Sequence, residues 1–236
     1  MTKAPEQSAP LGLARRTFAE FLGTAFLAAV VIGSGIAAQQ LSPDAVGLEL
    51  LENAVVTGAG LVAIISMLSG ASGAHLNPVV SIADASLGRI RWREVSAYVP
   101  AQVLGCVAGA VVANLMFSHA AITISTKHRA SGAHFLSELI ATVGLLVLIF
   151  ALVRSDRRSV IPIAVGSYIA AAYFFTSSTS FANPAITIGR MFSDSFAGIA
   201  PSSVPLFIVA QLVAVPLALA VILVLYPTVP AEKELA

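Results

Sequence analysis

Long stretches of apolar residues, separated by short polar segments, run along the whole chain. A helix that crosses a bilayer needs about 20 predominantly apolar residues to cover roughly 30 Å of hydrocarbon. Six stretches reach that length, at residues 17–38, 51–71, 94–117, 135–153, 159–179 and 203–226. The first is too long, and too weakly followed by a small-residue cleavage site, for a removed signal peptide. The pattern therefore predicts an all-α membrane protein with six transmembrane helices.

The composition of the chain agrees with this prediction. Of the 236 residues, 57% are hydrophobic and 11% are charged, which is typical of a membrane protein rather than a soluble domain. The formal net charge of +1 gives no indication of a nucleic-acid partner. We expect a single membrane domain at residues 14–228, between a cytoplasmic N-terminal tail at 1–13 and a cytoplasmic C-terminal tail at 229–236.

The distribution of basic residues predicts the orientation, because Lys and Arg in short loops favour the cytoplasmic side. With the N-terminus inside, most of the 13 basic residues fall on cytoplasmic segments, and the outside keeps only Lys127, Arg129 and Arg190. We therefore expect a multi-pass protein of the cell inner (plasma) membrane, in contact with lipid and with both termini in the cytoplasm.

The two halves of the chain, at about 14–117 and 135–226, carry the same features in the same order. Each half opens with a helix that holds a glutamate and closes with a helix that holds an Ala-Gln pair. Between them, a small and hydroxyl-rich segment leads into an Asn-Pro pair, in SGASGAHLNPVVSIAD and again in TSSTSFANPAITIGR. Because each half has three spans, an odd number, the second half enters from the opposite side, and the repeat is inverted.

The Asn-Pro segments at 77–87 and 183–193 are too short to cross the membrane. About 10 helical residues rise roughly 15 Å, which is half of the hydrocarbon core. Irregular backbone at membrane depth is tolerated only where it lines a cavity or is buried in protein. A single Asn-Pro pair could equally be a turn between helices, but two pairs at matching places predict two re-entrant half-helices that meet at the midplane.

The chemistry of Asn-Pro suits the tip of such a half-helix. Pro78 and Pro184 fit the first helical position, and Asn77 and Asn183 fit the N-cap. The positive ends of both helix dipoles then face the centre of a pore, where the two amides can donate to a passing oxygen while the field opposes cations. The residues before each Asn are expected to offer carbonyl oxygens to the pore; they are Gly73, Ala74, His75, Leu76, Thr179, Ser180, Phe181 and Ala182.

The segments SGAHLNPVVS and SFANPAIT resemble the paired Asn-Pro-Ala signatures of the aquaporin, or major intrinsic protein, family. The resemblance extends from about Ala14 to Tyr226. It implies a right-handed bundle of six transmembrane helices and two half-helices, with one pore in each subunit of a homotetramer. The second signature, with Ala185, is the usual one, whereas the first has Val79 in place of Ala.

The resemblance also implies a selectivity filter outward of the two asparagines. Counted without gaps against the water-channel pattern of the family, its four residues are Thr57, Ala171, Ser180 and Ile186. Water-selective relatives are expected to have an aromatic residue, a His, a small residue and an Arg there, and glycerol facilitators two aromatic residues, a Gly and the Arg. Loss of Arg removes five donors and a permanent charge, so we expect a wider and less polar filter.

Some bacterial aquaporins linked to arsenic resistance also carry an aliphatic residue in place of the filter Arg, and the chain resembles them. The hypothesis is a passive channel for small neutral solutes, including arsenous acid and methylated arsenic species, that also passes glycerol and water. An ordinary water or glycerol aquaporin is the alternative, with Arg190 rebuilding the filter from one helical turn beyond Ile186, where it could lie in the outer vestibule and attract polar solutes. Equally, Arg190 could reach the interface or pair with Asp194.

Ionisable groups inside membrane spans are functional candidates, and here they are Glu20 and Glu138. Their matching places in the repeat favour a structural role, in which each accepts hydrogen bonds from the loop before an Asn-Pro tip. An ion-coupled secondary transporter would instead use them as carriers. No nucleophile with a base, metal-ligand cluster or phosphate loop occurs, so we expect no enzyme, no metal and no cofactor. Asp84 is expected to pair with Arg89.

Overall fold

The computed structural model describes residues 11–227. Within that part of the chain there are eight α-helices, three short 3-10 helices and no strands. The long helices are α1 (Leu13–Leu41), α2 (Val46–Ser72), α4 (Trp92–Met116), α5 (Gly132–Arg154), α6 (Ile161–Phe175) and α8 (Val204–Leu225). The short helices are α3 (Pro78–Ser86), α7 (Pro184–Gly189), η1 (Arg158–Val160), η2 (Arg190–Phe192) and η3 (Pro201–Ser203).

The six long helices confirm the six predicted spans. Each is apolar and long enough to cross a membrane, α6 together with the η1 residues that precede it. The start of α2 at Val46 rather than residue 51 is the largest difference in bounds, and α6 stops at Phe175 rather than at residue 179. The sequence that follows, TSSTS, is rich in hydroxyl side chains that bond to the local backbone and compete with helix. The predicted tails lie almost entirely outside the described residues.

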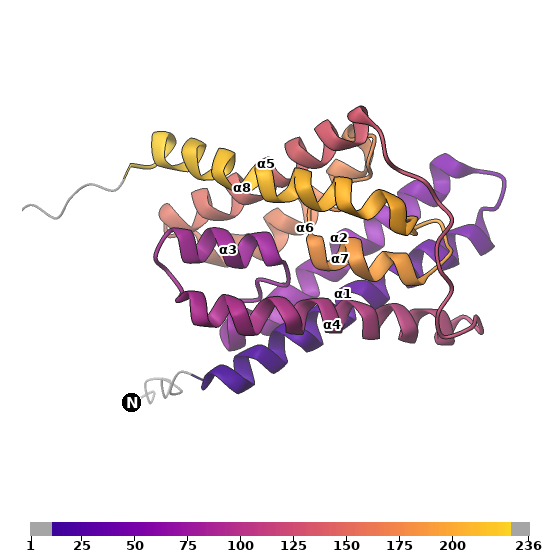
Figure 1. Ribbon diagram of the computed structural model, residues 1–236, viewed down its shortest axis with the longest axis horizontal. Coiled ribbons are helices and arrows are strands. Elements are labelled where there is room, and N and C mark those ends of the chain that lie inside the picture. The colour runs from indigo at the N-terminus through magenta and orange to yellow at the C-terminus, as the bar shows by residue number, and fades with distance from the viewer. Residues whose placement is uncertain (1–10, 228–236) are drawn as a thin grey trace, which may run out of the picture.

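The two half-helices lie in the middle of the bundle (Figure 1). In that view α3 comes in from the left and α7 from the right, and their N-termini meet near the centre, between the long helices. The described chain begins and ends at the same end of the bundle. Helices α1 and α4 pack closely, as do α5 and α8, which are the corresponding helices of the two halves. The architecture is therefore the inverted repeat that the sequence predicted.

Glycines allow two long helices to approach closely next to the cavity described below. A Cβ atom built on Gly166 of α6 would lie 2.5 Å from the carbonyl oxygen of Gly58 in α2, and one built on Gly58 would lie 2.8 Å from the oxygen of Gly166. Small residues of this kind are typical of helix contacts inside membranes. Along the outside of the bundle, large apolar side chains such as Leu104, Val112 and Leu217 are exposed, as lipid contact requires.

Candidate functional site

Asn77 and Asn183 cap the two half-helices. The side-chain oxygen of Asn77 accepts a hydrogen bond from Val79 N at 3.1 Å, and that of Asn183 accepts from Ala185 N at 3.0 Å and Ile186 N at 3.3 Å. A proline follows each asparagine at the first helical position, which has no partner for an N–H group in any case. Val79 itself is fully buried and packs in an apolar cluster with Leu146 and Val215.

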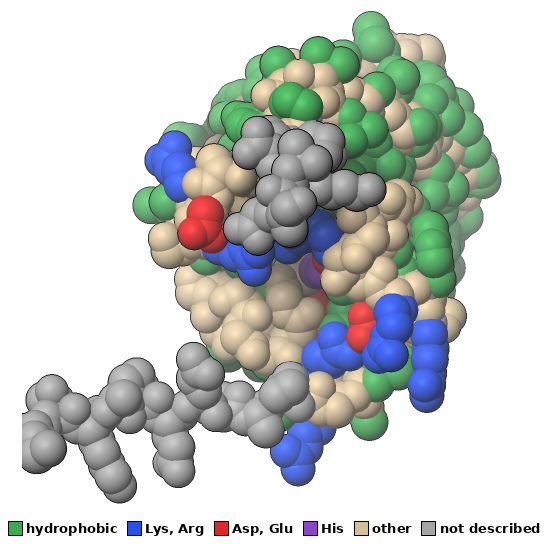
Figure 2. Space-filling view, turned by 90° about the vertical axis from the view of Figure 1, so that its left-hand side faces the viewer, with side chains coloured by type: hydrophobic (Ala, Val, Ile, Leu, Met, Phe, Trp, Pro, Cys, Tyr) green, Lys and Arg blue, Asp and Glu red, His purple; other side chains and the backbone are tan. Residues whose placement is uncertain are grey.

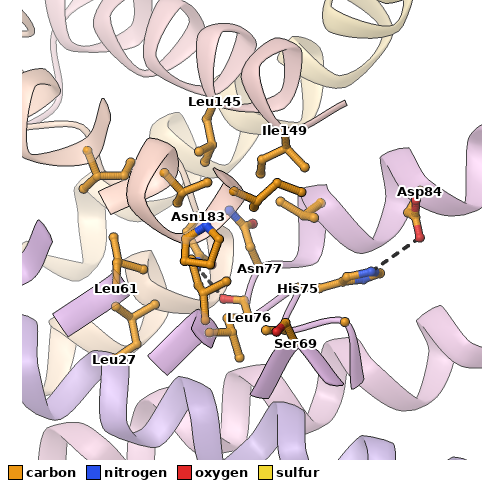
Figure 3. A pocket seen from close by; sticks show the side chains of 18 of the residues that line it. Leu27, Leu61, Ser69, His75, Leu76, Asn77, Asp84, Leu145, Ile149 and Asn183 are labelled. Carbon is orange, nitrogen blue, oxygen red and sulfur yellow. Dashed lines mark hydrogen bonds and ion pairs between the residues drawn. The ribbon is translucent and has the colours of Figure 1, made fainter. Parts of the chain in front are cut away.

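Each asparagine also reaches across to the other half of the repeat. Asn77 Nδ2 donates to the Ala182 carbonyl at 2.8 Å, and Asn183 Nδ2 donates to the Leu76 carbonyl at 2.7 Å. In Figure 3 the two asparagine side chains lie close together against the cavity. An amide nitrogen has two hydrogens, so each Asn has a second N–H for another acceptor. These reciprocal bonds join the two tips.

Glu20 and Glu138 hold the loops that lead into the tips. Glu138 is fully buried and accepts from Phe181 N at 2.8 Å, Ala182 N at 2.9 Å and Gln211 Nε2 at 2.7 Å. Glu20 is equally buried and accepts the matching bonds from its own half; its donors are His75 N, Leu76 N and Gln102 Nε2, with Ser72 Oγ as a fourth. Each glutamate thus accepts hydrogen bonds from the loop before an Asn-Pro tip.

These hydrogen bonds stabilise an unusual backbone. Ala74, Leu76, Thr179, Ser180 and Ala182 all have φ between 47° and 61°, in the left-handed region that non-glycine residues seldom adopt. Such conformations cost energy and persist only where the surroundings enforce them. A buried carboxylate that accepts two successive N–H groups of each loop provides that enforcement.

A cavity of about 590 Å³ runs past both tips. Its wall includes most of the residues that the sequence analysis singled out, namely Asn77, Asn183, Thr57, Ser180, Ile186, Gly73, Ala74, His75, Leu76, Phe181 and Arg190. Much of the remaining wall is apolar, and Figure 3 shows Leu27, Leu61, Leu145 and Ile149 around the asparagines. The cavity therefore offers hydrogen-bond donors at the two tips and hydrocarbon around them.

The structure corrects the assignment of Ala171 to the selectivity filter. It is exposed on the outside of α6 and does not line the cavity, whereas Ile169 and Tyr173, one turn apart, do. Residues two apart on a helix point in different directions, so a count without gaps placed the wrong face of α6 inward. Tyr173 is 2% exposed, and its hydroxyl lies 3.2 Å from Thr57 Oγ1. Tyr173 is not among the residues predicted from the sequence, although its four-residue spacing from Ile169 indicates a shared helix face.

Two of the expected carbonyl positions are also corrected. Thr179 and Ala182 are not part of the cavity wall. The Ala182 carbonyl accepts from Asn77 instead, and the Thr179 side chain is half-buried away from the cavity. The left-handed turns on either side rotate successive peptide groups, so only some residues of the loop reach the cavity.

Arg190 lies in the cavity wall and is 2% exposed. Its Nε donates to the Ala197 carbonyl, and its guanidinium carbon lies 3.4 Å from the centre of the Phe181 ring. Asp194 bonds to Thr126 instead, at 2.9 Å to the backbone nitrogen. Pairing of Arg190 with Asp194, or extension to the interface, is therefore wrong. Arg190 thus brings a guanidinium into the wall of the cavity, as the alternative assignment of the filter allows.

The mouth of the cavity near α3, on the far side of the tips from Arg190, is charged. Figure 2 shows Lys and Arg side chains around a hollow in which a histidine is visible. Asp84 lies 2.7 Å from Arg89 Nε, as expected, and 3.4 Å from His75 Nε2, the contact drawn in Figure 3. His75 Nδ1 is 3.0 Å from Ser81 Oγ, so both ring nitrogens orient the loop. Within residues 11–227, no three His, Cys, Asp or Glu side chains are arranged to hold a metal.

An inverted repeat with two half-helices, capped by asparagines that face one membrane-depth cavity, defines a membrane channel. The profile of the family Major intrinsic protein matches residues 7–180. The chain therefore belongs to the major intrinsic protein, or aquaporin, family, and it is a multi-pass membrane channel rather than an enzyme.

Individual relatives agree with this family. The chain is 47% identical over 208 residues to the aquaglyceroporin AqpS of Rhizobium meliloti, with 88% of each chain covered. It is 32% identical to aquaporin A of Dictyostelium discoideum, with 77% of this chain and 69% of that one covered. The X-ray structure of the aquaglyceroporin from Plasmodium falciparum superposes with a TM-score of 0.67 at 23% identity, over 89% of this chain and 96% of that one, and confirms the fold.

Proposed function

We propose that the chain is a passive channel for small uncharged hydroxylated molecules, with glycerol and water as substrates. The observation that carries this proposal is the pair of asparagine amides facing an apolar wall in one cavity. A polyol has hydroxyl groups along one edge and hydrocarbon along the other, and both kinds of surface are matched here. The similarity to two proteins named aquaglyceroporins supports the same substrate class.

Arsenous acid is the more specific substrate that we propose. At neutral pH it is an uncharged molecule with three hydroxyl groups, so it offers donors and acceptors like those of glycerol. The resemblance at Ile186 to bacterial aquaporins linked to arsenic resistance supports it. Methylated arsenic species follow by the same argument, because the methyl group would face the apolar wall.

An ion-coupled transporter is the less favoured candidate. Such a carrier needs carboxylates that exchange a proton or a sodium ion with the pathway. Glu20 and Glu138 are fully buried, are absent from the cavity wall and already accept four and three hydrogen bonds. These bonds are the reason to favour passive flux.

Purified protein in liposomes tests the proposal. Stopped-flow light scattering would follow the volume change after osmotic steps of sucrose and of glycerol, and arsenite entry would be measured by trapping. We expect faster flux of all three solutes than in empty liposomes, without any proton or sodium gradient. Water flux without glycerol flux would contradict the main proposal, and glycerol flux without arsenite flux would contradict only the proposal for arsenous acid.

Assembly and location complete the proposal. A homotetramer, with one pore in each subunit, fits the exposed apolar side chains that cover the bundle, some of which would pack on neighbouring subunits rather than on lipid. The similarity to AqpS of Rhizobium meliloti supports insertion in the plasma membrane, and the distribution of basic residues supports cytoplasmic termini. Cross-linking in detergent and accessibility of cysteines placed near each terminus are the corresponding measurements.

A further inference from the structure

Arg190 keeps free donors directed at the cavity. Its Nε donates to Ala197, and for its two terminal nitrogens no acceptor other than the Tyr173 hydroxyl is found among residues 11–227. Nor does any carboxylate of those residues form an ion pair with Arg190. Phe181 holds one face of the guanidinium. A guanidinium that is packed, positively charged and still able to donate is placed to bind a polar molecule.

Two hydroxyl groups lie in the same part of the wall. Ser180 is 2% exposed, lines the cavity, and its buried Oγ has no partner among the described residues. A buried hydroxyl without a partner is costly, and a molecule inside the cavity would remove that cost. Tyr173 also lines the cavity, and its hydroxyl faces both Thr57 and the Arg190 guanidinium.

The inverted repeat gives an independent reason to treat this position as functional. Arg190 follows Asn183 by seven residues, just as Asp84 follows Asn77, and both side chains line the cavity. Each also contacts the ring of the residue two positions before its asparagine. A carboxylate oxygen of Asp84 lies 3.4 Å from His75 Nε2, and the guanidinium carbon of Arg190 lies 3.4 Å from the centre of the Phe181 ring. The same place in each half therefore directs one charged side chain into the pore.

We propose that Arg190, with the hydroxyls of Ser180 and Tyr173, forms the polar side of the solute-selecting constriction. Arg190, which lies one helical turn beyond Ile186, has the role of the filter arginine, and Ile186 forms the apolar side. The site takes a small neutral polyol or a similar hydroxylated molecule and rejects cations. This inference rests on the proposed function and names the residues that determine its specificity.

Arg190→Met, Arg190→Lys and Ser180→Ala are the test variants, and Arg129→Met is the matched control. Arg129 is also buried, lies 5.4 Å from the Phe181 ring centre and donates to the carbonyls of Phe196 and Gly198, but it does not line the cavity. Water, glycerol and erythritol flux would be measured in liposomes, together with potassium leak. Circular dichroism and size-exclusion profiles verify folding.

Arg190→Met is expected to admit erythritol and to leak potassium, because it removes both volume and charge. Arg190→Lys should keep potassium out. Ser180→Ala should lower the glycerol-to-water flux ratio about fivefold, as for one hydrogen bond of ordinary strength. Arg129→Met should behave as the wild type. If Arg190→Met does not fold, the other two variants provide the test. Ser180→Ala removes a hydroxyl that has no partner among the described residues, and Arg190→Lys keeps the positive charge.

Equal selectivity of Arg190→Met and Arg129→Met, or an unchanged glycerol-to-water ratio in Ser180→Ala, would overturn this inference. Neither result would touch the proposed function, which stands or falls with the flux of the wild-type protein over empty liposomes.

Discussion

Replacing Glu138 by Gln tests how far the tip of the second half-helix depends on one carboxylate. One oxygen of Glu138 accepts from Phe181 N at 2.8 Å, and the other accepts from Ala182 N at 2.9 Å and Gln211 Nε2 at 2.7 Å. The amide of Gln has only one oxygen. Its NH2 group must therefore face at least one of these N–H donors.

The loss follows from that count. One charge-assisted hydrogen bond disappears, and a buried backbone N–H is left without an acceptor. At about 1.5–3 kcal/mol for the bond and about 1–3 kcal/mol for the orphaned N–H, Glu138→Gln should cost roughly 3–5 kcal/mol. For a chain of this length each kcal/mol lowers the melting temperature by roughly 2–4 °C, so a fall on the order of 10 °C is expected. Phe181 lines the cavity, so glycerol flux should fall as well.

The assays are thermal unfolding in detergent and glycerol flux in liposomes. Glu20→Gln should give the same result from the other half of the repeat. Glu52→Gln is the control, since that half-buried carboxylate accepts from Ser42 Oγ alone among the described residues. A melting temperature of Glu138→Gln within about 2 °C of the wild type, which is less than 1 kcal/mol, together with unchanged flux, would refute the buttressing role.

Three further predictions concern the pore wall, helix packing and the loop between α4 and α5. Ile186→Arg should sharply reduce glycerol flux in liposomes, because it adds a second guanidinium to a wall that already has one; undiminished flux would show that residue 186 does not face the pathway. Gly166→Ala should lower the melting temperature, since its Cβ would lie 2.5 Å from a backbone oxygen of α2, whereas Gly70→Ala, with nothing within 4 Å, should not. Burial and the neighbouring arginines lower the pKa of Lys127 from 10.5 to about 8. Between about pH 8 and pH 10.5 the unfolded chain binds more protons than the folded chain, so stability should rise with pH over that window. Lys127→Met should reduce this rise, as measured by melting curves at several pH values.

The helices and half-helices could be predicted because their causes are local. A run of apolar residues of membrane length specifies a span, and Asn-Pro specifies an extended residue followed by the first turn of a helix. The hydrogen bonds of Glu20 and Glu138 could be anticipated as well, since the repeat places a glutamate in the helix that opens each half. In each case the relevant neighbours are close in the sequence or are repeated in it.

The cavity wall could be predicted only in part, because it depends on which face of each helix turns inward. Ala171 was misplaced because the hydroxyl-rich loop after α6 changes the register between Tyr173 and Asn183. Arg190 was left undecided because its direction is determined by Phe181 and by the carbonyl of Ala197. The contact with Ala197 joins residues on either side of a turn, and no pattern in the sequence indicates that it forms.

The two halves of the repeat differ at positions that line the cavity and lie close to each asparagine. Glutamate, glutamine and asparagine recur at matching places because both tips have the same orphan N–H groups and the same strained backbone to stabilise. The ring two residues before the asparagine and the charge seven residues after it change from His75 and Asp84 to Phe181 and Arg190. These positions line the cavity but carry none of the bonds that join the tips. Substitution there can change selectivity at one mouth without loss of the fold, which is why Arg190 is the better candidate for tuning the channel than either asparagine.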